Sequence, residues 1–443
     1  MNKEEKNFHA SRRKEFSKII GKDSIAIIFG STHYNKSYDG DFNFKQYKNF
    51  YYLTGFKEPN SALILAPSGV KIKSGDKEKS VNEILYVQKK DSIMETWNGK
   101  RLGFENVHSE LGIESAKDNY DLKKILTWKF FTKYRRLYIN FGEMIKLSGE
   151  MKEIITSFLT NLNEIAPNIE IIDASFILGK MRAIKTQFEI KKIQKACDIT
   201  IISFNAAMKI ITPGLYEYQI QASLEYNYKY NGSEDNAYSA IVAGGENACI
   251  LHYENNNQIL KSGELLLIDS GAEYNYYCSD ITRTFPINGK FSKEQRLVYN
   301  IVLNANKECI KKIKPGIKFS ELKDLSEKAL ADGLYVAGIL KNKKDIKNYS
   351  LHGVGHHIGL DTHDAVASNK TSSEDNDVLR KGNVLTIEPG LYFPSGSKGI
   401  SKKYWGIGIR IEDDVLVTGN GNENLTIAMV KEAEEIESLM KVE

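Results

Sequence analysis

Four acidic residues in the second half of the chain occur where apolar strands are expected to end or begin. Asp269 and Glu388 each close a short apolar run and are followed by a turn with glycine, whereas Asp280 and Glu412 lie on the strands that come next. If these strands pair, their carboxylates meet, and clustered buried carboxylates raise one another's pKa values unless cations are present. Two divalent ions would balance the four charges, with a neutral His356 as fifth ligand. The pattern therefore predicts a site for two metal ions.

The ligand types favour particular metals and a particular chemistry. Oxygen-rich sites with one imidazole favour Mn²⁺ or Co²⁺ before Zn²⁺. In paired sites a shared hydroxide is the nucleophile, and the metals polarise the carbonyl group under attack. We therefore expect two divalent ions, with Mn²⁺ as the first candidate and Co²⁺ or Zn²⁺ as alternatives.

The histidines are concentrated near these acids. Of the eight in the chain, five lie between residues 252 and 363, and four of those lie within residues 352–363. His352 and His356 have the i, i+4 spacing of a zinc-binding pair on a helix, but three nearby glycines argue against a helix, and the HExxH motif is absent. A zincin-type site is therefore disfavoured. His357 would point away from His356 in an extended segment, so we interpret it as a supporting or surface residue.

The elements that would position these residues occur twice. A helix is expected to end at Pro-Gly at residues 213–214 and again at 315–316, each time leading into a second helix. Each pair of helices is followed by a segment with histidine, an apolar strand that ends in an acid, and a later strand that carries another acid. Two similar halves predict an internally duplicated domain with one site between the halves.

The beginning of the chain has a different pattern. Short apolar runs closed by turn residues indicate four strands with helical segments between them, at residues 25–29, 62–66, 136–140 and 169–173. Residues 71–82, polar and rich in lysine, are expected to be a solvated excursion between strands. We predict an α/β domain over residues 1–178 and a second domain over 179–443 that opens with a long amphipathic helix.

Composition excludes several classes of protein. The 443 residues include 61 basic and 57 acidic side chains, and a net charge of +4 does not indicate binding to nucleic acid or to an anionic membrane. No apolar run approaches the length of a membrane-spanning helix, about 20 residues, and the charged N-terminus does not resemble a secretory signal. Four cysteines without a CxxC pair are typical of a reduced, cytoplasmic protein.

Taken together, the motifs resemble those of the pita-bread dinuclear metallopeptidases, most of all aminopeptidase P and then prolidase. The resemblance covers nearly the whole chain and rests on these segments: Tyr51-Tyr-Leu-Thr-Gly-Phe, Thr96-Trp-Asn-Gly, Ile268-Asp-Ser-Gly, Ser279-Asp-Ile-Thr-Arg, His352-Gly-Val-Gly-His-His, Thr386-Ile-Glu-Pro-Gly and Gly408-Ile-Arg-Ile-Glu. It implies an α/β N-terminal domain and an α+β pita-bread C-terminal domain with an internal pseudo-twofold duplication.

The resemblance also implies roles for the metal ligands. Asp269 would bind one ion alone through both oxygens, and Asp280 and Glu412 would bridge the two ions. His356 and Glu388 would complete the shell of the other ion, and Glu388 would also be the general base.

Further residues match the substrate pocket of the family. His252 and His363 would steady the scissile carbonyl and the developing tetrahedral species, and His352 and Tyr392 would line the proline side. Arg410 would hold a ligating carboxylate or meet the substrate. Trp97 matches a tryptophan that can reach a neighbouring subunit's site in family tetramers, which implies a homodimer or homotetramer.

The implied activity is removal of one residue from the N-terminus of peptides whose second residue is proline. Prolidase, restricted to Xaa-Pro dipeptides, stays open, because residues 365–376 lack the pattern associated with recognition of the substrate's end. Methionine aminopeptidases usually lack such an N-terminal domain, creatinase-type hydrolysis uses no metals, and non-catalytic binding modules of this fold typically lose ligands. The full ligand set therefore favours an enzyme.

Overall fold

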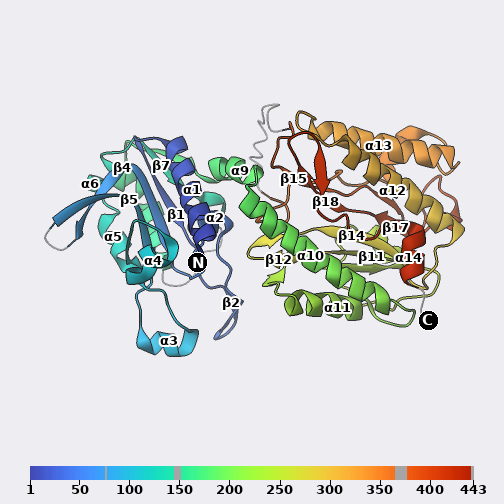
Figure 1. Ribbon diagram of the computed structural model, residues 1–443, viewed down its shortest axis with the longest axis horizontal. Coiled ribbons are helices and arrows are strands. Elements are labelled where there is room, and N and C mark those ends of the chain that lie inside the picture. Colours follow the sequence, from blue (N-terminus) through green and yellow to red (C-terminus); the bar gives the residue numbers. More distant parts are fainter. Residues whose placement is uncertain (75–76, 144–150, 365–376, 441–443) are drawn as a thin grey trace. The chain divides into compact units, whose positions relative to one another are not determined.

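The computed structural model describes residues 1–74, 77–143, 151–364 and 377–440 (Figure 1). The chain forms two compact units, Met1–Gly179 and Lys180–Glu443, and each has its own hydrophobic core. Within the described ranges, no helix is both long enough and apolar enough to cross a membrane.

A mixed sheet of six strands organises the N-terminal unit, in the order β6-β5-β4-β1-β7-β8. The central strand β1 (Ser24–Phe29) is buried along its whole length. It pairs on one side with β4 (Ala62–Ser74) and on the other with β7 (Arg136–Ile139). The remaining strands are β5 (Lys77–Val87), β6 (Ser115–Asp118) and β8 (Glu170–Asp173). Strands therefore occur at all four of the apolar runs that the sequence indicates.

The polar segment at residues 71–82 differs from the expectation. Its described parts, residues 71–74 and 77–82, belong to the antiparallel strands β4 and β5 of a hairpin, in which Val70 pairs with Val81 and Lys71 pairs with Ser80. The exposed side chains of Lys71 and Glu78 form an ion pair of 3.3 Å across the hairpin. Because the hairpin extends into solvent, its strands carry charged residues where a half-buried strand would carry apolar ones.

Two pairs of helices frame the C-terminal unit: α10 (Gln187–Ile210) with α11 (Glu217–Tyr230), and α12 (Lys293–Lys312) with α13 (Phe319–Val336). Both α10 and α12 begin with a capping box. Each is followed by the predicted Pro-Gly turn, in which Gly214 and Gly316 have φ angles of 95° and 90° that glycine adopts without strain. The first part of the predicted duplication is thus present as two helix pairs.

The strands repeat in the same way. β11 (Leu265–Ser270) pairs antiparallel with β14 (Ile281–Pro286), and β15 (Val384–Ile387) pairs antiparallel with β18 (Asp413–Val417). A further pair, β16 (Gly390–Phe393) and β17 (Ile407–Arg410), belongs to the second half. In Figure 1 the strands β11, β14 and β17 lie between α10 and α11 on one side and α12 and α13 on the other.

Candidate active site

Strand pairing brings the four predicted acids together. In the first half, Asp269 near the end of β11 lies opposite Thr282, two residues after Asp280. In the second half, Ile387 at the end of β15 lies opposite Asp413, so that Glu388 and Glu412 flank this pair. The same antiparallel arrangement therefore presents two acids from each half. The expectation that Glu412 lies on a strand is wrong, because β17 ends at Arg410, β18 begins at Asp413 with a different partner strand, and Glu412 lies between them.

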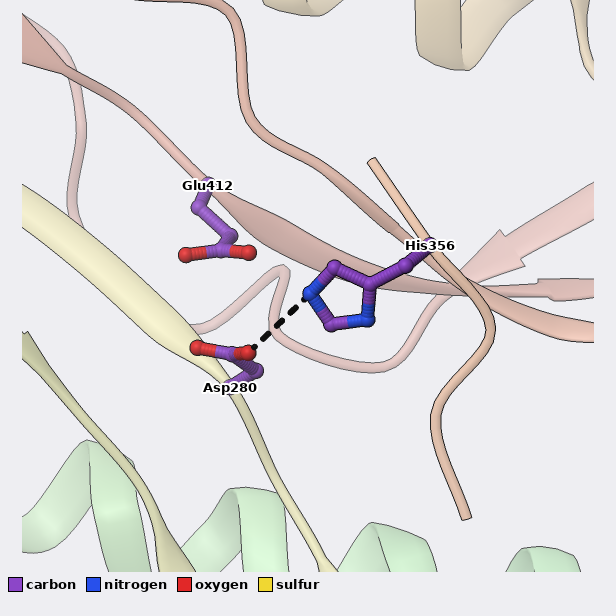
Figure 2. A group of neighbouring side chains, drawn as sticks. All are labelled: Asp280, His356 and Glu412. Atoms are coloured by element: carbon purple, nitrogen blue, oxygen red, sulfur yellow. Dashed lines mark ion pairs between the residues drawn. The ribbon is translucent and has the colours of Figure 1, made fainter. Parts of the chain in front are cut away.

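The best-defined cluster contains Asp280, His356 and Glu412, whose ligand atoms lie within 4.8 Å of one another. Figure 2 shows the three side chains pointing toward a common space, with Asp280 before β14, His356 on a loop and Glu412 between β17 and β18. Nε2 of His356 lies 3.5 Å from Oδ2 of Asp280 and 3.7 Å from Oε1 of Glu388. Four of the five predicted ligands therefore lie together: Asp280, His356 and Glu412 form the cluster, and Glu388 lies beside His356.

Asp269, the fifth predicted ligand, is connected to the others through neighbouring side chains. The Tyr238 hydroxyl lies within hydrogen-bond distance of the carboxylates of both Asp269 and Asp280, and its single proton can be donated to either one. Nη2 of Arg410 forms an ion pair with Oδ2 of Asp269, and Nε of Arg410 donates to the Thr282 hydroxyl at 3.1 Å. That hydroxyl in turn donates to Oε2 of Glu412 at 2.6 Å. These contacts fix the carboxylate orientations.

Burial makes the negative charges of this cluster unfavourable. It raises the pKa of Asp269, although Arg410 opposes the shift. Burial also raises the pKa of Glu388 to about 7 and, together with the charge of Asp280, raises the pKa of Glu412 well above its ordinary value. Burial alone would lower the pKa of His356, but its hydrogen bond to Asp280 and the charges of Asp280 and Glu388 raise it to about 9.

These shifts mean that the cluster, by itself, holds more negative charge than its surroundings compensate. Carboxylate oxygens and one imidazole nitrogen are ligands of divalent cations, and bound cations would restore the ordinary ionisation of the acids. The residues present therefore fit the divalent metal ions that the sequence predicts.

A pocket of about 260 Å³ opens beside the cluster, and most of the predicted site residues line it. These are His252, Asp269, His352, His356, His363, Glu388, Arg410 and Glu412. The rings of His356 and His363 are in edge-to-face contact with centroids 4.2 Å apart. Burial and the neighbouring His356 lower the pKa of His363. His252 and His363 thus lie on the wall of the same pocket as the proposed ligands.

His352 and Tyr392 form a second part of this site. Nε2 of His352 and the Tyr392 hydroxyl are 2.7 Å apart, and Nδ1 of His352 lies 3.4 Å from Oε2 of Glu388. Tyr392 is fully buried and also accepts a hydrogen bond from Nη1 of Arg410 at 2.8 Å. Burial and the Arg410 charge lower the pKa of His352 to about 4.

Two other residues singled out by the sequence lie elsewhere. Trp97 is on α3 (Ser92–Asn98) of the N-terminal unit, and 81% of its surface is exposed. His357 bridges to Leu385 through its backbone, and its ring is 6.5 Å from that of Phe319. Among the described residues, Nδ1 of His357 has no hydrogen-bond partner, and burial lowers the pKa of this histidine to about 3.

Sequence reasoning missed Tyr238 and Thr282, which contact three of the predicted ligands. Thr282 occurs within the motif that begins at Ser279, so its position was marked although its role was not. Tyr238 lies in a polar segment without a recognisable spacing. Only the fold brings it to the acids.

The duplicated strands, the carboxylate–imidazole cluster and the adjoining pocket define the class of metal-dependent hydrolases. Comparison with known proteins agrees. The sequence model of metallopeptidase family M24 matches residues 191–419, and the model of the aminopeptidase P N-terminal domain matches residues 9–138. The chain therefore belongs to metallopeptidase family M24 and, within it, to the aminopeptidase P group, whose pita-bread fold its C-terminal unit has.

Relatives match over nearly the whole length. A Xaa-Pro aminopeptidase of Haemophilus influenzae is 36% identical over 441 residues, which cover 98% of this chain and 96% of the relative. The Xaa-Pro aminopeptidase of Escherichia coli is 34% identical over 440 residues, 97% of this chain and 96% of the relative. Solved structures of E. coli aminopeptidase P with the inhibitor Pro-Leu, and in a zinc-substituted form with product, each have a TM-score of 0.88, 33% identity and 98% coverage of both chains.

Proposed function

We propose that the chain is a metal-dependent Xaa-Pro aminopeptidase, which releases the N-terminal residue from peptides with proline in the second position. The observation that carries the proposal is the convergence of Asp269, Asp280, His356, Glu388 and Glu412 from both halves of the C-terminal unit beside one pocket. Its relatives over the full length bear the name Xaa-Pro aminopeptidase, which supports the same activity.

The five residues are proposed to hold two divalent ions. Asp269 would hold one ion, His356 and Glu388 would hold the other, and Asp280 and Glu412 would be shared by both. When bound, such ions supply Lewis acidity and make a nucleophilic hydroxide available at neutral pH. Mn²⁺ is the proposed metal because carboxylate oxygens dominate the set, with Co²⁺ and Zn²⁺ as alternatives.

The other residues are proposed to orient the substrate and to take a proton from the attacking water. Glu388 accepts a proton from the attacking water at a carboxylate oxygen, a role that requires the carboxylate form. His252 and His363, on the wall of the pocket, donate hydrogen bonds to the scissile carbonyl oxygen as it gains negative charge. Arg410 holds the carboxylate of Asp269 in place.

His352 is proposed to line the proline side of the pocket. Tyr392 acts on this side through the hydrogen bond between its hydroxyl and the ring of His352. An Xaa-Pro amide has no N–H group and a fixed φ angle, so a site that grips ordinary backbone amides binds it poorly. A pocket that holds the ring by shape is the physical requirement for proline specificity.

The oligomeric state, the role of Trp97 and the cellular location are also proposals. Trp97 is exposed and therefore accessible to a second copy in a homodimer or homotetramer. All four cysteines, which lie within the described ranges, are free thiols, and this supports the cytoplasm as the location.

Hydrolysis of a small peptide panel tests this function. The protein, loaded with Mn²⁺, is incubated with Gly-Pro, with an Xaa-Pro-Xaa tripeptide and with its Xaa-Ala-Xaa counterpart, before and after chelation. We expect the protein to release the first residue from the proline tripeptide and to leave the other two peptides intact. This cleavage should be lost on chelation and restored when metal is added. Cleavage of Gly-Pro without the tripeptide would assign prolidase instead, and metal-independent cleavage or none would overturn the proposal.

A further inference from the structure

A single asparagine on α12 connects the two backbone segments that present Glu388 and Glu412. Nδ2 of Asn306 donates to the backbone oxygen of Ile387 at 3.0 Å and to that of Ile411 at 3.3 Å. Each of these carbonyl groups belongs to the residue immediately before a proposed ligand. Asn306 is fully buried, and its amide N–H groups are directed to these two carbonyls.

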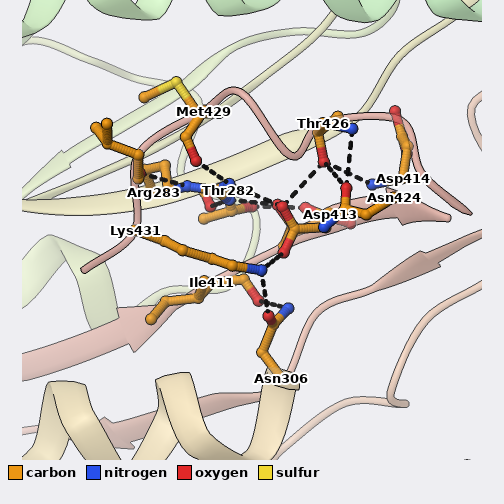
Figure 3. Close-up of polar contacts among 12 residues, drawn as sticks. Thr282, Arg283, Asn306, Ile411, Asp413, Asp414, Asn424, Thr426, Met429 and Lys431 are labelled. Atoms are coloured by element: carbon orange, nitrogen blue, oxygen red, sulfur yellow. Dashed lines mark hydrogen bonds and ion pairs between the residues drawn. The ribbon is translucent and has the colours of Figure 1, made fainter. Parts of the chain in front are cut away.

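The other end of the same amide is also held. Oδ1 of Asn306 accepts a hydrogen bond from Nζ of Lys431 at 2.9 Å, and Nζ forms a second contact, of 2.6 Å, with Oδ2 of Asp413. Figure 3 shows the Lys431 ammonium between the Asp413 carboxylate and the Asn306 amide, with Asn306 reaching from its helix toward Ile411. The lysine thus orients the amide so that its N–H groups face the two carbonyls.

A buried arginine completes the network around Glu412. Nη2 of Arg283 pairs with Oδ1 of Asp413 at 2.8 Å, and its Nη1 donates to the backbone oxygens of Thr282 and Glu412. The side chains of Arg283 and Asp413 are both fully buried, so the charges are paired in the absence of solvent. Removing one partner from such a pair is costly, because the other charge stays buried.

We propose that Asn306 is a positioning residue that sets the spacing between the backbone segments carrying Glu388 and Glu412, and thereby the affinity of the site for metal. This inference rests on the proposed function, because it takes both glutamates as ligands. An amide that donates to two carbonyls holds them at a fixed separation, and a change in either bond displaces the ligand that follows. Residues that orient metal ligands from outside typically account for roughly 10- to 100-fold in metal affinity.

Two substitutions separate this role from a change of charge. Asn306→Ala removes the donor and the acceptor together. Asn306→Asp keeps an oxygen for Lys431 but turns a carboxylate oxygen toward the two carbonyls, which repels them. An added negative charge alone would strengthen cation binding, so weaker binding in Asn306→Asp must come from displaced ligands.

Asn422 provides a matched control on β19 (Asn422–Asn424). Its Nδ2 also donates to two backbone oxygens, those of Ile310 at 2.8 Å and Ile313 at 3.0 Å, but neither residue precedes a proposed ligand. Asn422→Asp therefore makes the same chemical change at a similar pair of hydrogen bonds. It reports the general cost of losing such a bridge.

The experiment is calorimetric titration of Mn²⁺ into each metal-free, full-length protein, together with the visible absorption spectrum of the Co²⁺-loaded form. We expect the Mn²⁺ dissociation constant to rise at least 10-fold in both Asn306 variants and to stay within about 2-fold of wild type in Asn422→Asp. The Co²⁺ bands should shift only in the Asn306 variants, since they respond to ligand geometry. Circular dichroism checks the fold, and Asn306→Ser replaces any variant that does not fold.

Asn306 variants that bind Mn²⁺ as Asn422→Asp does, with the wild-type Co²⁺ spectrum, would overturn the positioning role while leaving the proposed function intact. A wild-type protein that binds no Mn²⁺, Co²⁺ or Zn²⁺ would overturn the proposed function and the inference with it.

Discussion

Arg410 and Asp269 form a buried ion pair that joins the two halves of the C-terminal unit, although 141 positions separate them in the chain. Arg410 comes from β17 in the second half, and Asp269 comes from β11 in the first. The same guanidinium also contacts Tyr392 and Thr282, so one side chain orients parts of the metal cluster and of the proline side. The site depends on the pairing of both halves at this residue.

Arg410→Lys tests this dependence. Lysine keeps the positive charge but cannot reproduce three directed contacts from one planar group. We expect kcat for an Xaa-Pro-Xaa tripeptide to fall roughly 10- to 100-fold with saturating Mn²⁺. Arg296→Lys is the control, because Arg296 pairs with Glu434 and Glu437 away from the pocket. Equal kcat values for the two variants would contradict the orienting role.

A buried carboxylate on α11 holds the loop that carries His252. Glu217 accepts hydrogen bonds from the backbone N–H groups of Gly244 and Gln258, at 2.7 and 2.9 Å. It also accepts from the Asn247 amide at 3.0 Å and from the Tyr253 hydroxyl at 2.8 Å, so that its partners flank His252 on both sides.

Glu217→Gln should therefore disturb His252 without disturbing the metal ligands. Glutamine offers one acceptor oxygen in place of two, and each lost bond to a charged group costs about 1.5 to 3 kcal/mol. We expect kcat/KM to fall about 10-fold while the Mn²⁺ dissociation constant stays within about 2-fold. Glu225→Gln, on the same helix, is the control. A parallel loss of metal binding would show that the loop acts on the ligands instead.

Asp364 should make stability depend on pH. It contacts Nη2 of Arg182 and, at 2.9 Å, Nζ of Lys185, and all three side chains are buried. Burial alone would raise the pKa of Asp364, but the two cations outweigh it and lower the pKa to about 2. Because the folded-state pKa lies below the unfolded value, the stabilisation is complete above about pH 4 and is lost as pH falls toward 2.

The expected size of this contribution is about 2 kcal/mol at pH 7. Denaturant unfolding of wild type and Asp364→Asn, at several pH values between 7 and 3, measures it. The difference between the two proteins should be greatest at pH 6–7 and should shrink by roughly half near pH 3. A difference that is constant over this range would mean that the pKa of Asp364 is the same in the folded and unfolded protein, which would contradict the prediction.

The sequence predicts the fold where local pattern and burial agree. The apolar runs at β1 and β7 and the repeated Pro-Gly helix ends are local signals, and strands and turns occur there. The hairpin at residues 71–82 was not predicted, because exposed strands need no apolar alternation. The position of Glu412 between two strands was also missed, because it depends on which strand each neighbouring segment pairs with.

The candidate ligands could be singled out from sequence because each lies at or near a strand end or in a glycine-rich loop with a distinctive neighbourhood. Tyr238, Glu217 and Asn306 could not, because they reach the site through contacts between segments far apart in the chain. A buried side chain that contacts backbone carbonyls on two strands leaves no periodic signal. Such supporting residues require the three-dimensional structure.

The most direct test of the account compares wild type with Glu388→Gln at saturating Mn²⁺, with mass spectrometry of the products from an Xaa-Pro-Xaa tripeptide. Wild type should release only the first residue. Glutamine has the same shape but cannot accept the proton, so the rate should fall by about 10² to 10⁴. A Glu388→Gln variant that cleaves at the wild-type rate, or a wild type that leaves the peptide intact, would contradict the account.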